Sequence, residues 1–165
     1  MNMREDRQLY TFGQNIELLK QLNAHCISYL LVGGLAVSWY CPSRQAQDMD
    51  LLIDPNPLNA DKLEKILSQW GIVSSRLDGP HRLLVLKSVH YADLLTPPAE
   101  WPKYEEISMR AGTCRVAGEV VPVVSIRNLI RLKEIACVAQ PDNSEKHMSD
   151  IKTLKAVLLS SHQIE

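Results

Sequence analysis

The first third of the chain most constrains the fold, because it holds two strand-length apolar runs on either side of a glycine pair. Residues 29–32 (Tyr-Leu-Leu-Val) form the first run, Gly33-Gly34 follows directly, and residues 35–39 have the composition of a short helix. Asp48-Met49-Asp50 then opens the second run, Leu51-Leu52-Ile53. Glycine after an apolar run indicates a tight turn, since it tolerates backbone angles that other residues avoid. The order predicts strand, glycine turn, helix and strand.

The two carboxylates of Asp48 and Asp50 point to the same face of an extended chain, roughly 6.5–7 Å apart along the strand. At that spacing they can reach one divalent cation, or flank two ions roughly 4 Å apart. An isolated Asp-x-Asp is also common at strand ends and turns, and a lone Gly-Gly is often only a turn. The combination in this order favours a site for a metal-bound triphosphate.

Asp93 supplies a third carboxylate within a later apolar stretch. Residues 82–87 predict one strand, and Val89 to Leu95 predict a second or its continuation past a bend. An unpaired carboxylate is costly in an apolar segment, although Asp93 would also fit a strand end at the surface. Three acids brought together repel and raise one another's pKa unless a cation neutralises them. We therefore expect Asp48, Asp50 and Asp93 to lie on neighbouring strands and to face one cleft, with Gly33-Gly34 at its rim.

Period-two alternation gives this expectation a testable form. Met49, Leu51 and Ile53 should point into the core, whereas Asp48, Asp50 and Leu52 should share the opposite face. At least one of the three acids should have a raised pKa.

Length, composition and charge exclude several classes of protein. With 165 residues, 45% of them hydrophobic, the chain can bury one core, and a second full domain is not expected. A net charge of −1 argues against a nucleic-acid-binding or membrane-surface protein. The charged start and the lack of a long apolar segment argue against a signal peptide and a membrane span. Four widely spaced cysteines indicate reduced thiols. We expect a cytoplasmic protein.

The coarse pattern predicts a mixed α/β (α+β) domain over residues 1–165. A small mixed sheet with helices packed on one side should occupy residues 1–124, and C-terminal helices residues 125–165. The expected helices, placed by periodicity and capping residues, are 13–26, 35–40, 58–70, 126–139 and 145–159. The expected strands are 28–32, 48–53, 72–75, 82–87, 89–95, 106–111, 114–116 and 120–124, the last two forming a hairpin.

The chain resembles the nucleotidyltransferase superfamily that shares the DNA polymerase β fold, and within it the small bacterial AbiEii-type and aminoglycoside-type or lincosamide-type proteins. Residues 31–37 and 44–53 carry the match, and Asp93-Leu94-Leu95 stands where the family places its third carboxylate. Residues 121–133 resemble the entry to its C-terminal helices, and residues 146–151 its late basic-then-Asp segment. Two departures stand out: Ala46 replaces a frequent threonine or serine, and residues 39–42 (Trp-Tyr-Cys-Pro) replace a histidine-glycine turn.

The resemblance implies roles for these residues. Asp48 and Asp50 would hold Mg²⁺, and Asp93 would complete a second metal site and act as general base. The backbone of Gly33 and Gly34, with the side chains of Arg44 and Lys133, would bind the phosphates. Arg44 and Lys133 have an alternative interpretation as ordinary solvated charges.

Two further polar residues of the last helix have simpler interpretations. Asp150 is explained by a pair with Lys146 one turn earlier. His147, like the histidines at positions 25, 81 and 90, shows no ligand spacing and is interpreted as structural or surface.

The leading hypothesis is a Mg²⁺-dependent nucleotidyltransferase that moves NMP from an NTP to a hydroxyl of a small molecule, a protein or a tRNA end. The alternative is a non-catalytic protein of the same fold, acting as one component of a toxin–antitoxin pair or as a protein-binding module. Its partner would then be a cognate toxin or antitoxin. Nucleic acid is not expected as a partner except for a tRNA end, because the chain has no basic excess and a single Phe.

Overall fold

The computed structural model describes residues 7–73, 76–87 and 90–161. The helices are α1 (Asn15–Ala24), α2 (Gly33–Tyr40), α3 (Pro57–Gln69), α4 (Tyr104–Ser108), α5 (Ile126–Ala139) and α6 (Ser144–Ser161), with a short 3₁₀ turn at Pro141–Asn143. The strands are β1 (Tyr29–Val32), β2 (Met49–Ile53), β3 (Leu83–Leu86), β4 (Ala92–Leu95), β5 (Gly112–Val116) and β6 (Glu119–Val123). The mixed α/β class expected from the sequence is confirmed.

The strands form one six-stranded mixed sheet in the order β3-β4-β2-β1-β6-β5. β2 lies between β1, to which it is antiparallel, and β4, to which it is parallel. The register sets Val32, the last residue of β1, beside Asp50, and sets Asp50 beside Asp93. The glycine pair and the acidic residues, far apart in the sequence, therefore meet at one end of three adjacent strands.

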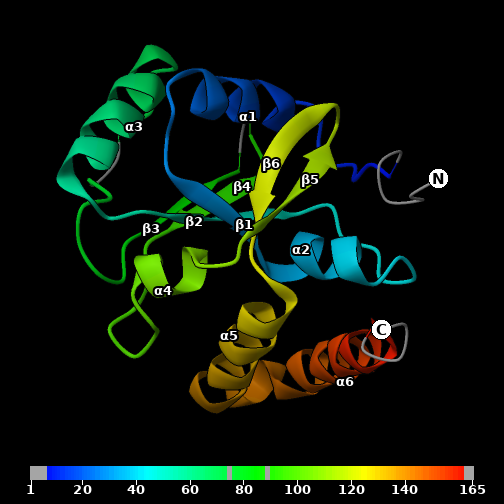
Figure 1. Ribbon diagram of the computed structural model, residues 1–165. Coiled ribbons are helices and arrows are strands. Elements are labelled where there is room, and N and C mark those ends of the chain that lie inside the picture. Colours follow the sequence, from blue (N-terminus) through cyan, green and yellow to red (C-terminus); the bar gives the residue numbers. More distant parts are fainter. Residues whose placement is uncertain (1–6, 74–75, 88–89, 162–165) are drawn as a thin grey trace.

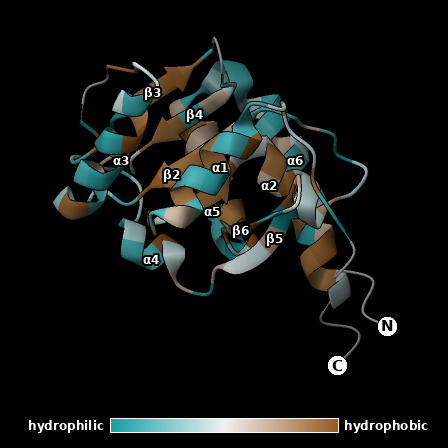
Figure 2. Cartoon of the chain, turned by 90° about the horizontal axis from the view of Figure 1, so that it is seen from above, coloured by the Kyte–Doolittle hydropathy of each residue, from teal (hydrophilic) through white to brown (hydrophobic). Residues whose placement is uncertain are grey.

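The core lies on both faces of the central strands. All four residues of β1 are buried, and in β2 only Asp50 is partly exposed. Helices cover both sides of the sheet, and not one side only as the sequence predicted, and Leu52, which the alternation assigns to the face of Asp50, is therefore fully buried as well. In Figure 1, α1 and α3 lie above the strands, and α5 and α6 lie below them. Figure 2 shows the hydrophobic strands beneath α1, whose outward side is hydrophilic.

Local signals account for most element ends. Ser125 caps α5, accepting a hydrogen bond from the backbone N–H of Asn128 at 3.2 Å. Gly71 follows α3 with φ +70, the left-handed conformation that glycine favours at a helix end. Ala117 and Gly118 both have positive φ and close the β5–β6 hairpin. α2 begins two residues earlier than expected, at Gly33 itself.

Two strand predictions are wrong. Residues 106–111 were expected to be extended, but Tyr104–Ser108 is the helix α4, because Tyr104 and Ile107, three residues apart, are both buried on one side of it. Residues 72–75 were also predicted as a strand, of which 74 and 75 lie outside the described residues. Ile72 instead donates a backbone hydrogen bond to Leu67 at the end of α3, and Val73 is 98% exposed; neither residue belongs to a strand.

The start of the strand predicted over residues 89–95 also differs. Residue 89 lies outside the described part of the chain, and β4 begins at Ala92. Among the described residues, no helix combines the length and the apolar character that a membrane crossing requires.

Candidate functional site

The three predicted acids lie together on two adjacent strands. Asp50 is in β2, Asp48 immediately precedes that strand, and Asp93 is in β4, directly opposite Asp50 in the parallel register. All three line one pocket of about 250 Å³, together with Lys87 and Tyr91. The apolar residues around each acid fix this placement, since burial of Met49 and Leu51 leaves Asp50 on the pocket face. The expectation that the three acids face one cleft is therefore met, whereas neither glycine of the pair lines this pocket.

Burial and like charges raise the pKa values of two of the three acids. Burial raises the pKa of Asp50 to about 6, and the neighbouring Asp93 and Asp48 contribute, while the positive charges of Lys133 and Lys146 oppose the shift. Burial also raises the pKa of Asp93; Lys87 opposes this shift and Asp48 adds to it. The expectation of at least one raised pKa is confirmed, and a positive charge between these oxygens would relieve the repulsion.

Gly33 is required by the close approach of Asp50. Its φ is +69, and a methyl group added there would overlap Asp50 Oδ2 and lie 2.9 Å from Asp50 Cγ. Gly34 lies against the loop before β2, where a Cβ would come 3.3 Å from Ala46 Cβ and 3.8 Å from Arg44 Nη2. The glycine pair is therefore more than a turn, because it lets the first turn of α2 pack against the carboxylate strand.

The two predicted phosphate ligands converge on a residue that the sequence interpretation set aside. Arg44 Nε donates to Asp150 Oδ1 at 3.0 Å, and Lys133 Nζ lies 2.9 Å from Asp150 Oδ2. Asp150 and Lys133 are buried, with side chains 5% and 9% exposed, so neither is a solvated surface charge. The interpretation of Asp150 as an intrahelical partner of Lys146 is wrong. Burial alone would raise the pKa of Asp150, but hydrogen bonds from Lys133 and Arg44 hold it below its usual value.

This ion-pair cluster joins three elements: the loop after α2, α5 and α6. The signal that could have identified Asp150 is its spacing, since Leu154, one turn later on α6, is fully buried and places Asp150 on the same inward face. Its partners could not be identified from the sequence, because Arg44 is 106 residues away.

Lys133 also lines a second pocket, of about 360 Å³, that shares Asp50 and Asp93 with the first pocket and also includes Gly33. Leucines of β3, β4 and α5 form its apolar wall, and His147 of α6 lies in the same lining. The two pockets meet at Asp50 and Asp93, so these carboxylates border both of them.

The acids do not enclose a metal ion by themselves. Within the described ranges, no group of three or more His, Cys, Asp or Glu side chains is placed so that it could hold one as it stands. The donor set still suits Mg²⁺, which prefers carboxylate oxygens and usually takes one or two of them, the rest of its shell coming from water and substrate phosphates. Asp50 and Asp93, side by side with raised pKa values, fit that requirement.

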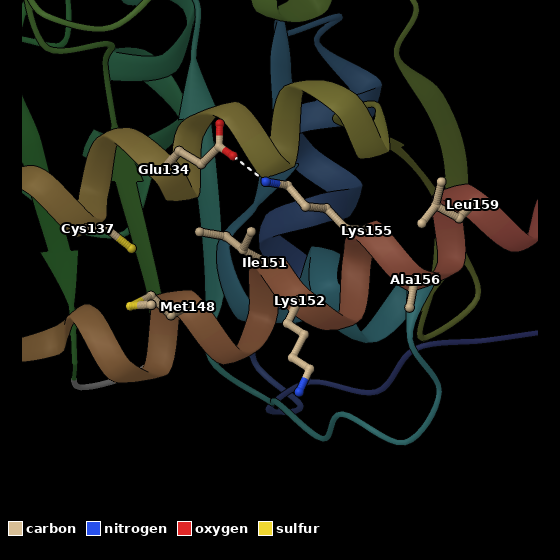
Figure 3. A pocket seen from close by; sticks show the side chains of 8 residues that line it. All are labelled: Glu134, Cys137, Met148, Ile151, Lys152, Lys155, Ala156 and Leu159. Carbon is tan, nitrogen blue, oxygen red and sulfur yellow. Dashed lines mark hydrogen bonds and ion pairs between the residues drawn. The ribbon is translucent and has the colours of Figure 1, made fainter.

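A wider hollow, of about 620 Å³, lies between α5 and α6, away from the acids. Figure 3 shows Cys137 and Met148 facing one another there, and the ion pair between Glu134 and Lys155 at 2.8 Å bridging the two helices. None of the candidate site residues lines it.

Comparison by sequence finds no match, either to a protein-family profile or to a curated protein. Comparison by structure finds nucleotidyltransferases. ANT(2″)-Ia in complex with adenylyl-2″-tobramycin is similar over 90% of this chain and 90% of that one, with a TM-score of 0.57 and 19% identity. Lincomycin-bound LnuA, a lincosamide antibiotic adenylyltransferase, is similar over 90% and 99%, with a TM-score of 0.51 and 17% identity.

A third similar structure is an antigenic nucleotidyltransferase-like protein from Paracoccidioides brasiliensis, over 86% of this chain and 74% of that one, with a TM-score of 0.55 and 19% identity. At these identities the likeness establishes the fold. The chain has the nucleotidyltransferase fold that the sequence predicts.

Proposed function

We propose that the protein is a Mg²⁺-dependent nucleotidyltransferase, which moves NMP from an NTP to a hydroxyl acceptor and releases pyrophosphate. The observation that carries the proposal is the pairing of Asp50 with Asp93 across parallel strands, with Asp48 lining the same pocket and Gly33 packed against Asp50. The similar structures, two of them of adenylyltransferases, support it.

In this proposal the carboxylates of Asp48, Asp50 and Asp93 hold the metal. When bound, Mg²⁺ neutralises the phosphates and stabilises the charge that develops on the attacking and leaving oxygens. A cation would favour the ionised form of Asp50, whose pKa is raised to about 6 by burial and two like charges.

The remaining residues position the substrates. Asp93 accepts the proton of the acceptor hydroxyl, whose oxygen forms a bond to the α-phosphorus; the bond from that phosphorus to the bridging α,β oxygen breaks, and pyrophosphate leaves with the electron pair. Lys133 and Arg44 bind phosphate oxygens from positions that Asp150 fixes, and the N–H groups of Gly33 and Gly34 add donors. Positioning and charge neutralisation supply most of the catalysis in reactions of this kind.

Calorimetric titration with ATP, CTP, GTP and UTP in the presence of Mg²⁺ tests the proposal. Wild-type protein should bind at least one of the four, and Asp48→Asn with Asp50→Asn should abolish that binding. Asp61→Asn is the matched control, because it removes a carboxylate from the exposed surface of α3. If no NTP binds, or if the double variant binds as wild type does, the proposal is wrong.

A second candidate is a non-catalytic protein of the same fold that acts as a protein-binding module or as one component of a toxin–antitoxin pair. The observation that favours it is the engagement of both Arg44 and Lys133 by Asp150, which occupies the cations a triphosphate would need. Metal-dependent NTP turnover by the purified protein would exclude this candidate. A stable stoichiometric complex with a partner protein, without NTP binding, would support it.

A further inference from the structure

His147 is a polar residue whose hydrogen-bonding capacity the fold does not use. It lies in the first turns of α6, and both ring nitrogens, Nδ1 and Nε2, are buried without a hydrogen-bond partner among the described residues. Buried polar atoms in native proteins are almost always paired. Leaving such an atom unpaired costs stability, whereas an apolar side chain of similar size would not. The imidazole therefore requires an explanation beyond packing.

The location of His147 connects it to the candidate active site. It lines the pocket of about 360 Å³ that also contains Gly33, Asp50, Asp93 and Lys133. Most of the remaining lining is apolar, so the polar atoms of this pocket are few. A ligand that reaches Asp50 and Asp93 from this side thus shares its pocket with the imidazole.

The charges around His147 suit an anionic ligand. Burial lowers the pKa of His147, and the charges of Lys133 and Lys146 lower it further, against an opposing effect of Asp150. The same two lysines act on Asp50, so the imidazole and the carboxylate lie in one electrostatic neighbourhood. A neutral imidazole keeps one N–H donor. Lys133 is already engaged by Asp150 at 2.9 Å, whereas the donor of His147 is unused.

We propose that His147 is a nucleotide-binding residue that donates a hydrogen bond to a phosphate oxygen of the NTP. The proposal rests on the proposed nucleotidyltransferase function and adds a phosphate ligand from α6 to those contributed by α2 and α5. A phosphate satisfies the buried donor, and it lies near Lys133 and Lys146, which favour negative charge.

Substitution separates this role from a structural one. His147→Leu removes both unpaired nitrogens and keeps an apolar volume, so its melting temperature should equal or exceed that of wild type. Its affinity for Mg²⁺–NTP should nevertheless fall by about tenfold, the loss expected for one hydrogen bond to a charged group. His147→Gln retains a donor and should recover most of the affinity. His25→Leu, an exposed histidine at the end of α1, is the control and should bind as wild type does.

The ring-nitrogen NMR signals of His147, recorded on protein labelled at histidine, identify the group that is contacted. Mg²⁺–tripolyphosphate should shift these signals, and adenosine alone should not. A shift with adenosine and none with tripolyphosphate would overturn the proposal, because the contact would then be to the nucleoside. If wild type binds NTP and His147→Leu binds equally well, this inference alone fails. If wild type binds no NTP, the proposed nucleotidyltransferase function is wrong, and the role of His147 that rests on it is wrong as well.

Discussion

Gly33→Ala should impair the site more than it impairs the fold, and Gly71→Ala provides the matched control. The two glycines have nearly the same backbone conformation, with φ of +69 and +70. An alanine in that conformation lowers the free energy of unfolding by about 1–2 kcal/mol at either position. At Gly71 no atom lies within 4 Å of the added methyl group, so backbone strain is the whole cost. At Gly33 the methyl group overlaps Asp50 Oδ2, and relieving the overlap costs about 1–3 kcal/mol more.

Thermal unfolding and calorimetry measure the two effects separately. Each kcal/mol lowers the melting temperature of a protein of this size by about 2–4 °C, so Gly71→Ala should lose roughly 2–8 °C and Gly33→Ala more. Gly71→Ala should bind Mg²⁺–NTP as wild type does. Gly33→Ala should bind at least about tenfold more weakly, because Asp50 is displaced from its position. Equal NTP affinity of Gly33→Ala and wild type would refute the inference that Gly33 shapes the carboxylate site.

Three further outcomes follow from the structure. The pKa of Asp50 is raised from about 3.9 in the unfolded chain to about 6, so this group lowers the free energy of unfolding as pH rises through that interval. Asp50→Asn should therefore raise the free energy of unfolding by about 2–3 kcal/mol at pH 7.5 and by little at pH 4. Denaturant unfolding at the two pH values measures this difference. Asp150→Asn should lower the free energy of unfolding by about 3–5 kcal/mol at pH 7, because it leaves the buried ammonium of Lys133 unpaired. Since the pKa of Asp150 is lowered in the folded protein, the difference between variant and wild type should shrink as pH falls below about 4. Ser125→Ala should cost about 1 kcal/mol through loss of the N-cap of α5, and an unchanged melting temperature would contradict that assignment.

The central sheet could be predicted from the sequence because its strands carry their own signals. Tyr29–Val32 is a continuous apolar run and Met49–Ile53 is apolar apart from Asp50, as strands buried on both faces require, and the turn at Ala117-Gly118 fixes the hairpin of β5 and β6. Asp50 and Asp93 stood out because each lies within an apolar stretch, and Asp48 stood out by its spacing of two residues from Asp50. Their mutual placement then followed from strand pairing.

The ion-pair cluster around Asp150 and the burial of His147 depend on contacts between distant segments, which no local sequence pattern encodes. The local sequence gives Asp150 no partner beyond its own helix, whereas packing of α6 against α5 and α2 brings it to Arg44 and Lys133. His147 is likewise unremarkable in sequence, and only its buried, unpaired nitrogens distinguish it. The strand predicted over residues 106–111 overlaps the helix α4, in which burial of Tyr104 and Ile107 on one side favours the helix.

The central claim is that Asp48, Asp50 and Asp93 together hold a metal-bound triphosphate, and a crystal structure tests it most directly. Crystals grown with Mn²⁺ and a non-hydrolysable NTP would locate the metal by its anomalous signal. The account predicts metal against Asp50 and Asp93, with phosphate oxygens reaching Gly33 and Lys133. A nucleotide bound elsewhere, or metal sites that involve none of the three acids, would contradict it.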